Sequence, residues 1–170
     1  MRILIVVPSH NRVSVNWVTA QRFQRGLEKL GHQVALHEAQ LQADPLFRQQ
    51  LRDFAPDVVL LLHAYRAGKP WLEAANGLNI PYVVLLTGTD VNHGLDDPEQ
   101  KGVIRAILRQ AAFVLLHNPL IAAKLTTSHP ELAANLCQLT PGITLAETGY
   151  DLRGIHALNT QQTLLLCPAG

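Results

Sequence analysis

Short apolar runs alternate with longer amphipathic segments along the chain. Several runs are continuously apolar instead of alternating in polarity, which is typical of strands buried on both faces of a parallel sheet. The pattern predicts six strands, at residues 3–7, 33–36, 58–62, 82–86, 113–116 and 163–167.

The segments between these runs have helical spacing and recognisable start signals. One apolar face recurs every three or four residues at Ala20, Phe23, Leu27 and Leu30, with Gly31 as a stop. An Asp or Asn followed by proline is a usual N-cap and first helical position, and it opens three further segments at Asp44-Pro45, Asp97-Pro98 and Asn118-Pro119. Pro70 is expected to open another helix, whose apolar face is Trp71, Leu72, Ala75 and Leu78.

This alternation predicts an α/β fold with a doubly wound parallel sheet, in three α/β/α layers like a Rossmann domain. Right-handed crossovers place helices on both faces of such a sheet. Ligands of these sheets bind beyond the carboxyl ends of the strands. The candidate functional residues are therefore those that follow each predicted strand.

The composition narrows the classes of function. The 170 residues are 48% hydrophobic and 16% charged, with a net charge of +1, so neither nucleic acid nor an anionic membrane is an expected partner. No run approaches the roughly 20 apolar residues of a membrane helix, and the apolar stretch before Pro8 is too short for a signal peptide. Cys137 and Cys167 form no Cys-x-x-Cys pair, so we expect free thiols in a cytoplasmic protein.

The sharpest local signal is a polar corner after the fourth run, Thr87-Gly88-Thr89-Asp90. Gly88 permits a tight turn or a close approach of the backbone to a ligand. Thr87 and Thr89 offer hydroxyl donors, and Asp90 could orient a ligand hydroxyl or cap a backbone amide. Taken alone, the stretch fits a capped turn at the end of a strand as well as it fits a ligand wall.

Two cations follow the third run. Arg66 and Lys69 could form a clamp for phosphate or carboxylate, for which arginine offers a bidentate fork. A solvated charged loop explains them equally well. His63 directly follows the strand, at the edge where a ligand is expected. Asn16, at the predicted start of the first helix, is interpreted as its N-cap. The alternative is that this end of the helix faces a ligand, and both interpretations can hold together.

The residues alone indicate no metal site and no nucleotide fingerprint. The histidines near strand ends (His10, His63, His93 and His117) lack the local spacing of zinc ligands. Hydrogen-bonded histidines are the favoured interpretation, with a general base as the alternative. In Asp96-Asp97, the second residue is interpreted as a helix cap and not as part of a metal-binding pair. Because Gly-x-Gly-x-x-Gly and P-loop motifs are absent, a phosphate would have to bind a helix N-terminus without a glycine-rich loop.

Taken in order, several segments resemble the family-4 (group 1) glycosyltransferases. NWVTAQRFQRGLEKLGHQVAL (residues 16–36) is similar to their first helix and second strand, and APDVVLLLHAYRAG (55–68) to their Pro-Asp-Val-Val strand. IPYVVLLTGTDV (80–91) is similar to their His-Gly-Thr-Asp corner. AAFVLLHNPLIAAKL (111–125) and LTPGI (139–143) resemble the next strand and helix and the segment before the second domain. The resemblance keeps register over roughly residues 3 to 145.

The resemblance implies a GT-B enzyme with two Rossmann-like domains, in which this chain supplies the acceptor side. Residues 1–160 would form that domain and residues 161–170 the start of a donor-binding domain, in a protein roughly twice this length. The implied reaction moves a sugar of hexosyl type from a nucleotide-diphosphate sugar to a small or anionic acceptor, with retention and without a metal or cofactor. The isolated chain is expected to be inactive. The expected substrate-binding residues are Asn16, His63, Arg66, Thr87, Gly88, Thr89 and Asp90.

Two departures from the family pattern limit this transfer of roles. PSHNRVSVNW (residues 8–17) replaces the glycine-rich loop that many members carry after the first strand. Thr87 stands where a histidine is usual, so the role of that histidine cannot be carried over and the catalytic residues stay unassigned.

One branch of the family, the selenosugar synthases, shares the Thr-Gly-Thr-Asp corner. It also has Asn-Trp-x-Thr-Ala-x-Arg at the first helix and Leu-His-Ala-x-Arg at the third strand. The matching residues here are Asn16, Trp17, Thr19, Ala20, Arg22, Leu62, His63, Ala64 and Arg66. These enzymes join a sugar from a UDP-sugar to selenophosphate, and a small anion of this kind would give Arg66 a binding role.

A stand-alone flavodoxin-like binding or regulatory domain is the alternative function. A response regulator needs a phosphoacceptor Asp at the end of a central strand, and the only Asp after a strand here, Asp90, lies beyond a glycine. Half of a GT-B epimerase or phosphorylase would share the fold but has no specific support in the sequence.

Overall fold

The computed structural model describes residues 1–9, 14–42, 44–142, 149 and 151–163. They belong to two compact units, Met1–Thr140 and Pro141–Gly170, and each is described by itself. The boundary expected at residue 160 lies within the second of these units. Among its described residues, that unit has one short helix, α6 (Leu152–Ile155), which Asp151 caps by accepting the Gly154 amide at 2.9 Å.

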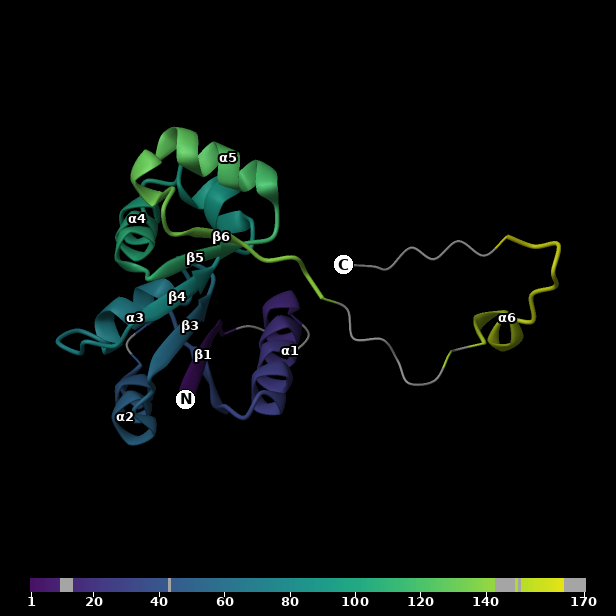
Figure 1. Cartoon of the computed structure of the whole chain (residues 1–170), viewed down its shortest axis with the longest axis horizontal. Helices are drawn as coiled ribbons and strands as arrows, with labels where there is room; N and C mark the ends of the chain where they lie inside the picture. The colour runs from purple at the N-terminus through teal and green to yellow at the C-terminus, as the bar shows by residue number, and fades with distance from the viewer. Residues whose placement is uncertain (10–13, 43, 143–148, 150, 164–170) are drawn as a thin grey trace. The chain divides into compact units, whose positions relative to one another are not determined.

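The first unit is built on a six-stranded parallel sheet in the order β2-β1-β3-β4-β5-β6 (Figure 1). Five predicted strands are confirmed: β1 (Arg2–Pro8), β2 (Gln33–Ala39), β3 (Val58–Leu62), β4 (Tyr82–Leu85) and β5 (Phe113–Leu116). The sequence pattern does not predict β6 (Leu136–Gln138), because only three residues pair with β5 and so short a strand leaves no apolar run. The strand predicted at residues 163–167 lies outside the described residues from 164 onward.

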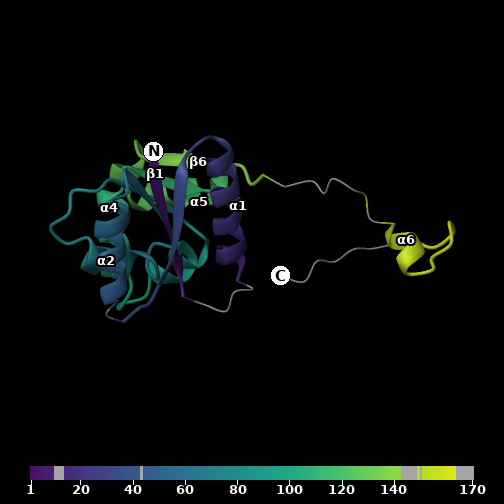
Figure 2. The same cartoon turned by 90° about the horizontal axis from the view of Figure 1, so that it is seen from below.

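The helices divide unequally between the two faces of the sheet (Figure 2). Helix α1 (Val15–Lys29) packs Ala20 against one face, together with Ile5 and Leu62. Helices α2 (Pro45–Phe54), α3 (Gly68–Ala74), α4 (Lys101–Gln110) and α5 (Pro119–Ser128) contribute to the core on the other face. This arrangement confirms the doubly wound α/β fold, and it brings the carboxyl ends of all the strands to one edge of the sheet.

Helix starts follow the predicted capping rules at two places. Asp44 caps α2 by accepting the Phe47 amide at 3.1 Å, and Asn118 caps α5 by accepting the Leu120 amide at 2.9 Å. In both cases proline occupies the first turn, as expected for a position whose missing N–H costs nothing.

Three other helix boundaries differ from the predicted ones. Ser14, and not Asn16, caps α1 by accepting the Trp17 amide at 3.3 Å, so Asn16 is the second residue of the helix. Asp97 accepts the Glu99 amide at 2.8 Å in a turn that leads into α4, and the helix begins only at Lys101. Helix α3 ends at Ala74, so Leu78 lies beyond it and is 36% exposed.

Two short helical turns complete the first unit. η1 (Asp90–Gly94) is a π-helical turn that follows the polar corner, and η2 (Pro130–Leu132) precedes β6. π-Helical turns occur frequently at functional sites. In the described ranges, no helix is both long and apolar enough to cross a membrane.

Candidate functional site

Strand order reverses at β1, which lies between β2 and β3. Ligands of open α/β sheets bind at such a switch point, beyond the carboxyl ends of the strands. Here the chain has a hollow of about 290 Å³, lined by Pro8, Ser9, Ala39, Gln40, Leu41, Gln42 and Arg66. We call it the Arg66 hollow.

The chemistry of the Arg66 hollow is set by one cation and several neutral groups. Among the lining residues that the structure describes, only Arg66 carries a charge. Gln40 and Gln42 add amide groups, and Ser9 adds a hydroxyl that lies 3.5 Å from Glu38 Oε1. Lys69, the other cation of the predicted clamp, does not line the hollow. A guanidinium beside neutral hydrogen-bonding groups suits a small anionic ligand.

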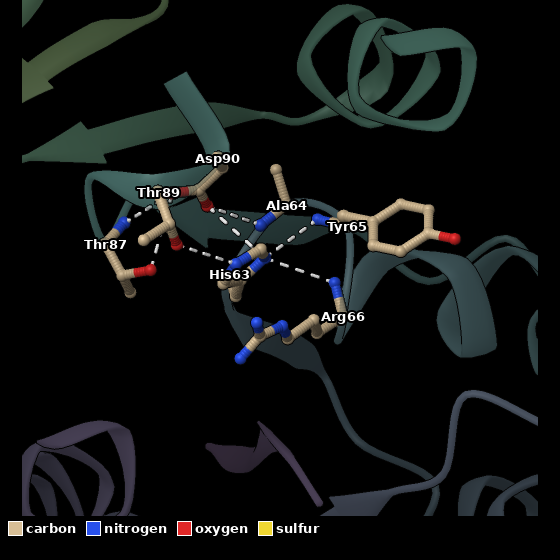
Figure 3. A network of polar contacts seen from close by, with 7 residues as sticks. All are labelled: His63, Ala64, Tyr65, Arg66, Thr87, Thr89 and Asp90. Atoms are coloured by element: carbon tan, nitrogen blue, oxygen red, sulfur yellow. Dashed lines mark hydrogen bonds and ion pairs between the residues drawn. The ribbon is translucent and has the colours of Figure 1, made fainter. Parts of the chain in front are cut away.

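His63 lies beside Arg66 in Figure 3, and only 3% of the residue is exposed. Its Nδ1 accepts two backbone amides, from Tyr65 and Arg66, both at 3.1 Å. Nδ1 therefore carries the lone pair and Nε2 the proton, which is donated to Thr89 Oγ1 at 3.1 Å. This is a neutral imidazole of one fixed tautomer, and it positions the backbone that carries Arg66. The arrangement does not favour the alternative role of His63 as a general base.

Asp90 joins the ends of β3 and β4 and is fully buried. Its Oδ2 accepts the Ala64 amide at 2.8 Å, and its Oδ1 accepts the Thr87 amide at 3.0 Å. Asp90 Oδ2 also lies 3.6 Å from His63 Nδ1. We call the set of His63, Ala64, Thr87, Thr89 and Asp90 the Asp90 clamp (Figure 3).

The clamp determines which groups of the corner face outward. The Asp90 carboxylate caps backbone amides, which is one of the two roles expected for it, and its contact with a ligand stays a prediction. Thr87 and Thr89 are exposed, and Gly88 between them is half-exposed. Both hydroxyl groups also bond within the clamp, since Thr87 Oγ1 donates to Asp90 Oδ1 at 3.4 Å and Thr89 Oγ1 accepts from His63 Nε2 at 3.1 Å.

The same contacts occupy a backbone site that commonly binds anions. The amides of residues 64 to 66 begin the turn that leads into α3, and such amides often bind phosphate. Here Asp90 accepts the first and His63 accepts the next two. An anion near this turn would therefore be bound by the Arg66 side chain and not by the start of the helix.

Gly88 adopts a backbone conformation that suits glycine, with φ of 101°, and a Cβ placed there would meet nothing within 4 Å. We expect Gly88→Ala to lower the free energy of unfolding by about 1–2 kcal/mol, because left-handed backbone is strained in any residue with a Cβ. Gly102→Ala is the matched control, since Gly102 lies in α4 with equally open space. It should raise stability by about 0.5–1 kcal/mol through its better helix propensity. Urea unfolding measures both, and equal effects would contradict the interpretation.

The remaining candidate residues lie apart from this network. Asn16 is half-buried in the first turn of α1, and nothing described connects it to the Arg66 hollow. His93 is exposed in η1, His117 Nδ1 lies 2.7 Å from the Leu139 carbonyl oxygen, and His10 is outside the described residues. Nowhere in the described part of the chain do three His, Cys, Asp or Glu residues gather as metal ligands.

Residues 40–42 are part of the hollow that sequence reasoning missed. Gln40, Leu41 and Gln42 belong to no motif, and their only signal is their position after β2. The predicted rule that ligands bind beyond strand ends, applied to every strand, would have included them.

The sheet order and the position of the hollow define a Rossmann-like domain of the kind found in GT-B proteins. Two solved structures share this fold. UDP-GlcNAc 2-epimerase from Methanocaldococcus jannaschii matches 81% of this chain and 45% of its own, with a TM-score of 0.58 and 10% identity. A structure of S. aureus MnaA with UDP matches 79% and 42%, with a TM-score of 0.56 and 12% identity.

In sequence, the chain is similar to Glycosyltransferase 1 domain-containing protein 1 of Xenopus tropicalis. The two are 27% identical over 115 residues, which cover 68% of this chain and 32% of the relative. The chain thus spans about a third of the length of that curated relative. No protein-family model matches the chain. The predicted resemblance is supported as distant homology to a glycosyltransferase 1 domain on a GT-B type of fold.

Proposed function

We propose that this chain is the acceptor-side part of a glycosyltransferase that transfers a sugar from a nucleotide-diphosphate sugar to a small anionic acceptor. The observation that carries the proposal is the Arg66 hollow, a cationic site at the switch point of a Rossmann-like sheet. Distant similarity to a glycosyltransferase 1 domain supports the class of reaction.

The size and charge of the hollow support a small anion as the acceptor. Pockets for drug-sized ligands usually enclose about 300–1,000 Å³, and the hollow of about 290 Å³ lies just below that range. Arg66 supplies the positive charge, while the side-chain amides of Gln40 and Gln42 can hydrogen-bond the remaining oxygens of a ligand. Thr87 and Thr89, exposed on the Asp90 clamp, are the proposed contacts for the sugar.

Finer features of the reaction rest on the sequence resemblance and are proposals. They are retention, hexosyl transfer, catalysis without a metal or cofactor, and donor binding by a second domain. Two of the solved proteins that share this fold are a UDP-GlcNAc 2-epimerase and MnaA in a complex with UDP, which fits a uridine nucleotide sugar as the donor. The selenosugar-synthase branch remains a prediction, with selenophosphate as one acceptor to test.

Titration of the chain with small anions, followed by amide NMR, tests this proposal. Sulfate, phosphate and selenophosphate should shift the amides of Ser9, Arg66 and residues 40–42, while UDP-glucose should bind weakly to the chain alone. FMN binding at the same strand ends would favour the flavodoxin-like alternative. Anion-induced shifts that exclude Arg66 and residues 40–42 would contradict the proposed acceptor site.

A further inference from the structure

His37 is a buried histidine that the proposed reaction does not use. It lies on the edge strand β2, is 8% exposed, and stacks on Phe47 of α2 with ring centroids 4.1 Å apart. Its Nδ1 lies 2.6 Å from Gln50 Oε1, and its Nε2 lies 2.9 Å from Asp44 Oδ2. We call His37, Asp44 and Gln50 the His37 latch.

The contacts of the latch favour one form of the His37 ring. Gln50 Nε2 donates to the Leu36 carbonyl oxygen at 3.2 Å, which orients the Gln50 amide so that its oxygen faces His37. Asp44 Oδ1 accepts the Phe47 amide at 3.1 Å, so this side chain caps α2 at the end of the helix where the dipole favours a carboxylate. Both ring nitrogens of His37 therefore face hydrogen-bond acceptors, and only the imidazolium form donates to both.

Asp44 is the charged group that faces the His37 ring in the described structure. Glu38 follows it on β2 but contacts Ser9, and Val6 pairs with His37 across β1. Arg48 of α2 donates to the Asn76 carbonyl oxygen at 3.2 Å. In its imidazolium form His37 is paired with Asp44, and loss of the proton would leave a lone pair against one of the two oxygens.

The latch is adjacent in the chain to the Arg66 hollow. Residues 40–42, which wall the hollow, lie between His37 on one side and Asp44 on the other. The bond from His37 to Asp44 therefore joins β2 to the start of α2 and brackets this wall.

We propose that His37 is a proton-dependent positioning residue for the Arg66 hollow. As imidazolium it bonds Asp44 and Gln50 and holds residues 40–42 in the shape that receives a small anion. Loss of the proton at higher pH releases this wall and weakens anion binding. The inference about binding rests on the proposed function, whereas the link between His37 and residues 40–42 does not.

Nitrogen-15 NMR of the ligand-free chain tests that link between about pH 5.5 and pH 8.5, where histidine changes charge. Both ring nitrogens of His37 should carry protons at the lower pH. The amides of Phe47 and residues 40–42 should then shift with the same midpoint as the ring. An unprotonated ring nitrogen at the lower pH would overturn the proposal. Amide chemical shifts that do not follow the titration of the ring would also overturn it. This measurement requires no variant.

Sulfate, whose charge is constant over this range, is the probe for binding. We expect its affinity to be about fivefold weaker at the higher pH, a usual size for coupling between two sites. His37→Gln should remove this dependence, and His32→Gln, a change at the other end of β2, should keep it. A sulfate affinity that does not change with pH would overturn the proposed coupling between His37 and the Arg66 hollow. If sulfate binds at no pH, the Arg66 hollow fails as an anion site, while the NMR titration still decides the role of the latch.

Discussion

Asp90→Asn is expected to lower the free energy of unfolding by about 2–4 kcal/mol, because hydrogen bonds to a charged group contribute about 1.5–3 kcal/mol each. Asp90 is fully buried and accepts amides from both Ala64 and Thr87. Asparagine can accept one of them with its oxygen, but its NH₂ group then faces the other N–H. Chemical unfolding of the chain measures the loss.

Asp96→Asn is the matched control for this substitution. Asp96 is an exposed carboxylate just beyond η1, and its change should stay within about 0.5 kcal/mol, as is usual at the surface. If Asp90→Asn were as mild as the control, the clamp would not hold β3 and β4 together. The amide signals of Tyr65 and Arg66 should also move in the Asp90 variant, since His63 binds both amides beside the lost carboxylate.

Arg66→Ala is expected to weaken the binding of sulfate or phosphate by about 10- to 100-fold, the loss of a charge-assisted contact worth about 1.5–3 kcal/mol. The substitution keeps the backbone amide that His63 Nδ1 accepts, so stability should change far less than binding. Isothermal calorimetry or amide NMR gives the affinity.

Two further variants identify the cause of that loss. Arg66→Lys keeps the charge but loses the planar fork, so its affinity should lie between those of the wild type and Arg66→Ala. Lys69→Ala removes a positive charge at the start of α3 without touching the lining of the hollow. It should weaken binding by less than about threefold, because salt screens a charge that does not contact the ligand. Equal losses of affinity from Arg66→Ala and Lys69→Ala would mean that the overall positive charge of this region attracts the anion and that no specific site binds it.

Most of the fold could be predicted because strand burial and helix capping depend on residues that are close together in the sequence. Continuous apolar runs identified five strands, and Asp44 and Asn118 identified two helix starts. No local feature of the sequence indicates the order of the strands, and β6 is too short to show an apolar run. The cap at Ser14 was misplaced to Asn16, since both are good capping residues and the sequence does not say which amide will be within reach.

The sequence predicted where the candidate site lies, but not which of its residues bond to one another. The rule about strand ends selected His63, Arg66 and the corner from Thr87 to Asp90. Nothing in the sequence pairs Asp90 with Ala64, because that bond joins residues brought together by two neighbouring strands. The tautomer of His63 and the proposed charge on His37 likewise depend on partners that only the fold supplies.

The separation between the Asp90 clamp and the walls of the Arg66 hollow also bears on how the chain can evolve. The clamp lies just beyond the ends of β3 and β4, whereas Gln40, Leu41 and Gln42 are exposed residues that follow β2. Exchanges of exposed side chains cost little stability, usually within about 0.5 kcal/mol. For the proposed anion site, new ligand preferences can therefore arise by changing these three residues while the scaffold that presents the arginine is inherited intact.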